Sequence, residues 1–223
     1  MDVDHYIAYM ARIEYELDVL VSLGNVQAVK TFLKTNPLID INFHILNDMM
    51  DQRFFFTEAS RSNHDAIVAI LLAHPAIDVN VQASDWGSAF SSVCNYSLTP
   101  CFRLLLGDPR VNVNQPDGIG TTPLWHAAHS GHLDLIKLWV ASGREMDLGT
   151  PGSQYTDPFT VAKMITWDSE DMKRKKLEIV SLLERSMENP EKTRIEVLQE
   201  LGIAGELSLG WHFNWEKVLT DFL

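Results

Sequence analysis

The amino-acid sequence predicts an all-α fold built from about five consecutive pairs of helices. The first observation is the equal spacing of His64, Leu98 and His132, which defines a period of about 34 residues. The second is an apolar segment at helical spacing after each of these positions, such as LIKLWV at 135–140. The third is the related ending of successive units, IDVN at 77–80 and VNVN at 111–114. A constant period of this length indicates stacked helical repeats.

The clearest unit spans residues 117–148. Thr122 can cap its first helix by accepting a backbone N–H bond. Pro123 suits the first helical position, where its missing N–H has no partner to lose. The small residues at 127–128 allow two helices to approach closely, and Gly131 suits the left-handed turn that ends the helix. Local signals in this unit therefore predict a helix, a tight turn and a second helix.

Residues 122–127 read TPLWHA and resemble the TPLHxA signature of the ankyrin repeat, with Trp125 in place of the signature histidine. The Gly131-His132 step and the DVN ending at 78–80 add to this resemblance. The resemblance implies an ankyrin-repeat solenoid, in which short β-turns connect the helix pairs and a C-terminal extension caps the last pair. It also implies that first helices and turns line the surface that meets a partner.

The repeat register set by this period divides the chain into three regions. Residues 1–42 are expected to form an N-terminal capping helix and a degenerate unit, and 43–183 the repeats. Thr156 and Ala162 lie one full period beyond Thr122 and Ala128 and mark the fifth unit. Residues 184–223 are expected to form a C-terminal helical extension. The expected repeats are at about 49–80, 83–114, 117–148 and 151–183, the last with an insertion near 167–175.

The C-terminal extension carries two apolar patterns. A helix is expected to start at the Asn189-Pro190-Glu191 sequence and to turn Ile195, Leu198 and Leu201 inward. Beyond it, the sequence has large apolar residues at helical spacing, namely Trp211, Trp215, Leu219 and Phe222. This stripe is expected to cover the last repeat, and the alternative is a docking helix for a partner or a second copy.

Three units depart from the ankyrin pattern, and the fifth of the chain has Asp157-Pro158 in place of Pro-Leu. The second unit has FFF at 54–56 where TPL is expected, and the third has SAF at 88–90. The third also lacks the Gly-His step, because Ser97-Leu98 stands there. These units are expected to be less stable than the fourth.

Charge and composition restrict the functional classes. The formal net charge is −12, so a phosphate backbone is not the expected partner. The basic residues at 173–176 are expected to form a solvated helix start, balanced by Asp168, Glu170 and Asp171. No apolar run approaches the roughly 20 residues that span a bilayer, and the acidic N-terminus does not resemble a secretory signal. A cytoplasmic or nuclear location is expected, with Cys94 and Cys101 buried and reduced.

Catalysis is not expected. His126, His129 and His132 could suggest a metal site, but Gly131 separates the last of them from the helix. Cys94 could suggest a nucleophile, but it aligns with the small buried position of Ala128. The sequence has none of the common phosphate-binding, zinc-protease or serine-hydrolase motifs. No metal or cofactor is therefore expected, and the alternative is an enzyme with an irregular site.

The expected function is binding of another protein by an adaptor or scaffold, which is expected to be a monomer. Tyr96 and Trp86 are aromatic residues of the type enriched in interfaces, and Asp51 with Asp85 suggests a partner that carries a basic patch. The repeat register gives the predicted contact residues: Asp51, Arg53, Arg61, Ser84, Asp85, Trp86, Asn95, Tyr96, Ile119, Thr121, His129, Ser130, Ser153, Gln154, Tyr155 and Lys163.

A further alternative treats the chain as the substrate of an asparaginyl hydroxylase. Asn80 and Asn114 close the turns at the ends of the second and third units. The resemblance to ankyrin repeats implies that such asparagines can be hydroxylated.

Overall fold

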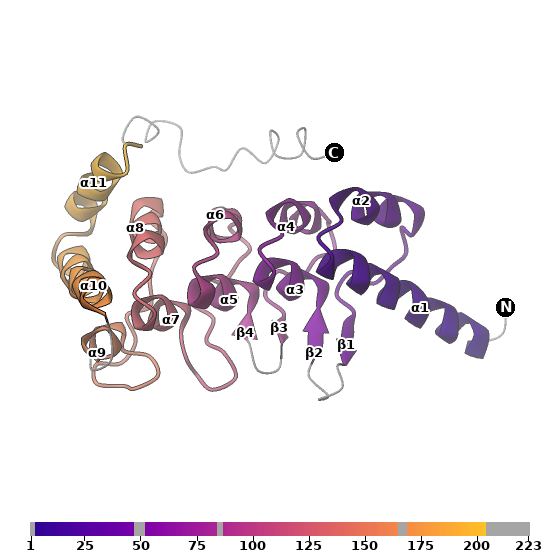
Figure 1. Cartoon of the computed structure of the whole chain (residues 1–223), viewed down its shortest axis with the longest axis horizontal. Coiled ribbons are helices and arrows are strands. Elements are labelled where there is room, and N and C mark those ends of the chain that lie inside the picture. The colour runs from indigo at the N-terminus through magenta and orange to yellow at the C-terminus, as the bar shows by residue number, and fades with distance from the viewer. Residues whose placement is uncertain (1–2, 47–51, 84–86, 165–168, 204–223) are drawn as a thin grey trace.

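The computed structural model describes residues 3–46, 52–83, 87–164 and 169–203, and shows a mostly helical protein (Figure 1). Its helices form two layers along a row, and neighbouring helices within each layer are in contact. The first layer contains α1 (Val3–Ser22), α3 (Phe55–Arg61), α5 (Ala89–Tyr96), α7 (Pro123–His129) and α9 (Pro158–Lys163). The second contains α2 (Val26–Thr35), α4 (Asp65–Leu72), α6 (Thr99–Gly107) and α8 (Leu133–Ser142), and α10 (Glu170–Glu188) and α11 (Pro190–Glu200) pack at the C-terminal end.

Short connections precede the first-layer helices on one side of the row. Two of them are antiparallel hairpins of short strands, whose bounds are β1 (His44–Leu46), β2 (Gln52–Phe54), β3 (Gln82–Ala83) and β4 (Gly87–Ser88). The turns before α7 and α9 project on the same side as these hairpins (Figure 1). The second-layer helices lie on the opposite side, so the two sides of the molecule present different kinds of structure.

Helix starts in the middle of the row follow the predicted local signals. The Thr122 hydroxyl accepts a bond from the Trp125 N–H at 3.3 Å, and Pro123 follows at the first helical position. Ser88 caps α5 in the same way, through the Ser91 N–H at 3.2 Å. In the fifth unit Thr156 lies one period beyond the cap residue Thr122, but it does not cap α9. Asp157 is the cap, and its carboxylate accepts from the Phe159 and Thr160 N–H groups.

A left-handed turn links the two helices of each inner unit. Asn63, Ser97 and Gly131 occupy the same position of three successive units and have φ angles of 56°, 56° and 67°. The third unit therefore makes the same turn as the fourth although it lacks the Gly-His step. In each case the backbone closes over the end of the first helix and starts the second, as in the bond from the His132 N–H to the Ala127 carbonyl at 2.9 Å.

The apolar core fills the space between the two layers. Its centre is aromatic: the Phe90 ring meets Trp139 edge-on at 5.0 Å and stacks on Phe102 at 5.3 Å. All three residues are fully buried. Burial of a large apolar side chain stabilises the fold by about 1.5–3 kcal/mol. This cluster joins a first-layer helix, α5, to the second-layer helices α6 and α8.

Asparagine side chains tie consecutive units together. The Asn80 amide donates to the Arg110 carbonyl at 2.9 Å and accepts from the Asn112 N–H at 2.7 Å. Asn42 makes the equivalent pair of bonds to Ala76 and Asp78. Asn114 makes them to Glu145 and Asp147. The amide that ends one unit thus binds the loop that ends the next, three times in succession.

Two predictions about the C-terminal part need correction. α11 starts at Pro190 as expected, but Ile195 is 46% exposed, while Val197 and Leu198 are buried. The inward face of α11 is therefore rotated away from Ile195. Lys176 is also buried rather than solvated, and its ammonium group lies 3.4 Å from the Met164 carbonyl oxygen.

The other basic residues of this segment behave as expected. Ion pairs join Lys173 to Glu170 and Arg174 to Asp171, at the solvated start of α10. Residues 170–175, part of the expected insertion, form the first turns of this helix. Asp168 and the apolar stripe of 211–222 lie outside the described residues. Among the helices that are described, none has the length and apolar character needed to cross a membrane.

We predict that replacing Ser97 with glycine stabilises the protein. A residue with a side chain loses about 1–2 kcal/mol in the left-handed region, whereas glycine there costs only its greater freedom in the unfolded chain, about 0.5–1 kcal/mol. The free energy of unfolding in urea should rise by about 0.5–1 kcal/mol. Ser130→Gly is the matched control, because Ser130 has a φ of −84° one position before the equivalent turn. An equal gain in both variants would contradict this account.

Candidate protein-binding face

The predicted contact residues are mostly accessible where the structure describes them. Arg61, Tyr96, Ile119, His129, Gln154, Tyr155 and Lys163 are exposed, and Arg53, Asn95, Ser130 and Ser153 are half-buried. Asp51, Ser84, Asp85 and Trp86 lie outside the described residues. We refer to the turns at 117–121 and 149–157, with β2 and the C-terminal ends of α3, α5, α7 and α9, as the turn face. Arg53 in β2 and Arg61 at the end of α3 both contact Glu58, so strand and helix end share a surface there.

Thr121 is the one described contact residue that the structure contradicts. It is 1% exposed and therefore cannot meet a partner. Asp117 binds the backbone on both sides of Thr121: its carboxylate accepts from the Thr121 N–H at 2.8 Å, and its own N–H donates to the Thr121 carbonyl at 2.9 Å. The turn folds back at this point, and its accessible tip is Ile119 instead.

Asp117 also fixes that tip. Its Oδ1 atom accepts from the Ile119 N–H at 3.1 Å, and its Oδ2 atom lies 3.0 Å from His126 Nε2 on α7. The carboxylate therefore anchors the turn to the first-layer helix that follows it. Ile119 remains 73% exposed on this anchored backbone. A large apolar side chain is thus presented to solvent by a turn with little freedom to withdraw it.

Asp157 organises the turn before α9 in a similar way. Its carboxylate accepts from the Gly152, Phe159 and Thr160 N–H groups and from the Thr160 hydroxyl, at 2.7–3.1 Å. Burial raises the pKa of Asp157, but these hydrogen bonds outweigh it and hold the pKa below its usual value. The aspartate therefore stays ionised and keeps the turn closed. Tyr155, within this turn, is 47% exposed.

The three histidines near α7 bind different groups and do not converge. His126 lies beside Asp117, and His129 stacks on the Trp125 ring with centroids 4.9 Å apart and planes at 4°. His132 places Nε2 2.9 Å from the carbonyl oxygen of Asn95 in the preceding unit. Within the described ranges, no three histidine, cysteine or carboxylate side chains are grouped as metal ligands. The contact of His132 ties its unit to the preceding one.

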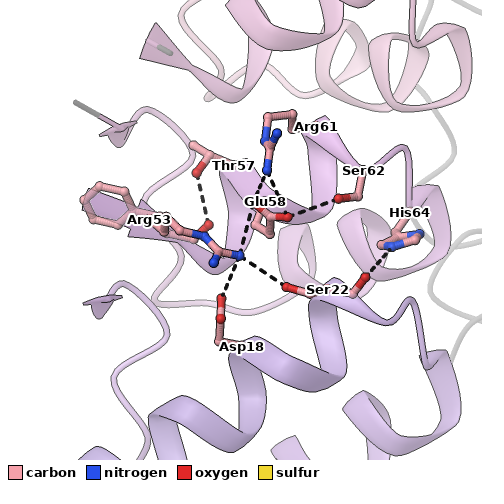
Figure 2. A network of polar contacts seen from close by, with 9 residues as sticks. Asp18, Ser22, Arg53, Thr57, Glu58, Arg61, Ser62 and His64 are labelled. Carbon is pink, nitrogen blue, oxygen red and sulfur yellow. Dashed lines mark hydrogen bonds and ion pairs between the residues drawn. The ribbon is translucent and has the colours of Figure 1, made fainter. Parts of the chain in front are cut away.

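A polar network joins α1 to α3 at the N-terminal end of the turn face, as Figure 2 shows. Arg53 Nη2 lies 3.6 Å from Asp18, 3.5 Å from Glu58 and 3.3 Å from the Ser22 hydroxyl. Arg61 donates to both carboxylate oxygens of Glu58, at 3.2 and 2.9 Å. Arg53, a predicted contact residue, therefore also holds the first two units together, and Arg61 braces Glu58 within α3.

The two carboxylates of this network have opposite electrostatic environments. Burial raises the pKa of Asp18; Arg53 opposes this, and the charge of Glu58 adds to it, so the pKa ends above its usual value. Burial also raises the pKa of Glu58, but hydrogen bonds and charge from Arg61, with Arg53 and Ser62, bring it below its usual value. Asp18 Oδ1 accepts no hydrogen bond within the described part of the chain. Sequence reasoning missed both acids, although Glu58 aligns with the inward-facing His126 at twice the period.

The hydroxylation candidates are engaged in the asparagine ties already described. The side chains of Asn80 and Asn114 are half-buried, and both ends of each amide bind the following unit. Asn42, which was not a candidate, makes the same contacts. Hydroxylation of Asn80 and Asn114 stays a prediction.

Both cysteines are buried free thiols, as expected. Burial raises the pKa of Cys94 well above its usual value, and burial with the nearby charge of Asp65 raises the pKa of Cys101 to about 12. Thiols with such pKa values are protonated at neutral pH and react poorly as nucleophiles. Cys94 therefore belongs to the core and does not form a catalytic centre.

Comparison with known proteins gives a partial likeness. No protein-family model matches the chain. SMC5-SMC6 complex localization factor protein 1 of Bos taurus is 32% identical over 105 residues, which make up 46% of this chain and 10% of that protein. The Homo sapiens protein of the same name is 31% identical over 105 residues, again 46% of this chain and 10% of the relative. The similarity thus covers about a tenth of the length of these curated relatives.

We predict opposite effects for two substitutions in the α1–α3 network. The pKa of Asp18 is higher in the folded state than in the unfolded state. Ionisation of this carboxyl therefore lowers the free energy of unfolding as pH rises. Asp18→Asn, which cannot ionise, should be more stable than the wild type near pH 7. The difference should vanish at about pH 3, where the carboxyl is protonated in both states. The pKa of Glu58 is lower in the folded state, so its ionised carboxylate stabilises the fold near pH 7 and this contribution is lost as pH falls. Glu58→Gln lacks the charge and should be less stable than the wild type near pH 7. Urea midpoints at the two pH values would test this, and shifts of the same sign would contradict it.

We also predict that the native protein resists alkylation. At about pH 8, iodoacetamide should modify Cys94 and Cys101 at least tenfold more slowly than it modifies the same cysteines in guanidinium chloride. Intact-mass spectrometry would measure both rates. Rapid labelling of Cys94 while circular dichroism remains native would show that the thiol is accessible, against the present account.

Proposed function

We propose that this chain is an ankyrin-repeat adaptor that binds another protein through the turn face. The observation that carries the proposal is the pair of exposed apolar side chains, Ile119 and Tyr155, on turns that are fixed by Asp117 and Asp157. Large apolar side chains supply much of the binding energy in protein interfaces. Holding them in place before binding lowers the entropy that association costs.

The rest of the turn face carries aromatic and charged side chains, which support binding of a protein partner. Tyr96 is 46% exposed at the end of α5, and the neighbouring unit presents the flat stack of His129 on Trp125. Arg61 and Lys163 add positive charge at the ends of α3 and α9. Aromatic, apolar and charged groups in one strip are typical of interfaces with an apolar centre and a polar rim.

The constant repeat period and the two-layer stack support the ankyrin assignment. The TPL run at 122–124 caps and starts α7, and the left-handed turn recurs at the same position in three units. The likeness to SMC5-SMC6 complex localization factor protein 1 supports an adaptor function, because that protein is named for localising a complex. The SMC5–SMC6 complex is therefore the first partner to test.

We predict that site-specific photo-crosslinking places the partner on the turn face. A benzophenone amino acid at position 119 or 155 of the full chain should crosslink to a subunit of purified SMC5–SMC6 complex. The same group at position 177 should not, because Leu177, whose 56% exposure lies between those of Ile119 and Tyr155, is on α10 and is not part of the turn face. Crosslinking from 177 but not from 119 or 155 would overturn the proposed face.

Alanine variants would measure how much each exposed apolar side chain of the turn face contributes to binding affinity. Ile119→Ala and Tyr155→Ala should each weaken binding of the purified complex about tenfold, as expected for a residue near the centre of an interface. Leu177→Ala is the matched control and should bind like the wild type. If the complex shows no binding to the wild-type chain, the assigned partner is wrong. If all variants bind equally, the assigned face is wrong.

A further inference from the structure

A second surface with different chemistry lies between α2 and α4, in the second layer of helices. It is an open groove of ≈ 390 Å³, which we call the outer groove. Leu33, Ile70, Ala73 and Pro75 form its apolar floor and walls. Ile70 is nearly buried and Leu33 is packed against the core, so the floor is part of the folded framework. The helices α2 and α4, which provide its lining, lie in the layer of helices on the side of the molecule opposite the turns (Figure 1).

The charged lining of the outer groove is entirely basic. Lys30 and Lys34 are one helical turn apart on α2, and no carboxylate is among the lining residues. This contrasts with a net charge of −12 for the whole chain. Elsewhere, lysines such as Lys137 and Lys173 pair with glutamates. Neither Lys30 nor Lys34 has a hydrogen bond or ion pair with any residue that the structure describes.

His74 adds a third donor at the opposite edge of the groove. Its Nδ1 atom accepts from the Ala76 N–H at 3.3 Å, so the ring proton resides on Nε2. The side chains that line the outer groove therefore offer donors and no anionic acceptor. A partner that fits must bring apolar groups for the floor and negative charge for the rim.

We propose that the outer groove binds a short acidic amphipathic helix of a partner protein. Apolar side chains on one face of such a helix would cover Leu33, Ile70 and Ala73, as in other helix-in-groove complexes. Residues four apart on a helix have Cβ atoms about 5–6 Å from each other, so glutamates at this spacing on the ligand match the spacing of Lys30 and Lys34 on α2. Lys30 and Lys34 would then select acidic partners by charge complementarity.

This inference goes beyond the proposed function, because it concerns another surface and another class of ligand. The turn face presents apolar tips to solvent, whereas the outer groove receives apolar side chains from its ligand. The two surfaces lie in different helix layers. One chain could therefore hold two partners at once, and the failure of either proposal would leave the other standing.

The test uses a synthetic helical peptide of about 16 residues, with leucines on one face and glutamates four residues apart beside them. Fluorescence anisotropy should show binding to the full chain. The affinity should fall at least tenfold in Lys30→Glu/Lys34→Glu and also in Ala73→Trp, which fills the groove without changing charge. Arg103→Glu is the matched control on α6, an exposed cation outside the groove, and should bind like the wild type. Circular dichroism would establish that each variant is folded.

Several results would overturn the proposal. These are no binding by the wild type, equal binding by the double lysine variant, or equal binding of a peptide with lysines in place of its glutamates. Tighter direct binding of labelled single-stranded DNA than of the peptide, lost in the lysine variant, would assign the site to nucleic acid instead. Carbodiimide coupling of Lys30 or Lys34 to Glu216 within one chain would assign the groove to the chain's own C-terminal residues. Ile119→Ala should leave peptide binding unchanged.

Discussion

The asparagine ties between units are the constraint on which the rest of the structure depends. Each amide of Asn42, Asn80 and Asn114 binds a carbonyl and an N–H of the next unit, so its donor and acceptor are satisfied only in one register. A shift by one residue would replace these exposed bonds with bonds to water, and each bond contributes about 0.5–1.5 kcal/mol to the correct register. Arg144 reinforces this register by donating to the Leu106 carbonyl of the preceding unit at 3.1 Å.

The sequence predicted the positions of the helices better than it predicted the cap of α9 and the buried face of α11, because these two features depend on contacts between units. Caps and apolar faces are local properties, so Thr122 and Leu124 behave as their neighbours in sequence imply. The sequence predictions differ from the structure where contacts between residues distant in the sequence determine the local geometry. α9 begins one residue later than a constant 34-residue period implies, with Asp157 as its cap. Ile195 is exposed because contacts with α8 and α10 set the rotation of α11.

The candidate face could be predicted in outline but not in its supporting contacts. The period placed Ile119 and Tyr155 in the connections between helix pairs, and both side chains are exposed there. It could not show that Thr121 folds inward, because this depends on two bonds to Asp117. Nor could it pair Arg53 with Asp18, which lies in the preceding unit. Sequence periodicity predicts where each residue lies within its unit. The charge environment of a side chain also depends on which residues of the neighbouring unit contact it.

The positively charged side chains divide into arginines that hold the units together and lysines that line the outer groove. Arg110 and Arg144 bind carbonyl oxygens at the ends of second-layer helices, and Arg53 binds the acids of the α1–α3 network. These arginines are therefore committed to holding units together. In a chain of net charge −12, that commitment leaves few cations for other uses. Lys30 and Lys34, which pair with no residue in the described ranges, consequently give the outer groove a local charge opposite to that of the whole protein. Such a local charge is a stronger basis for selecting a partner than apolar area alone.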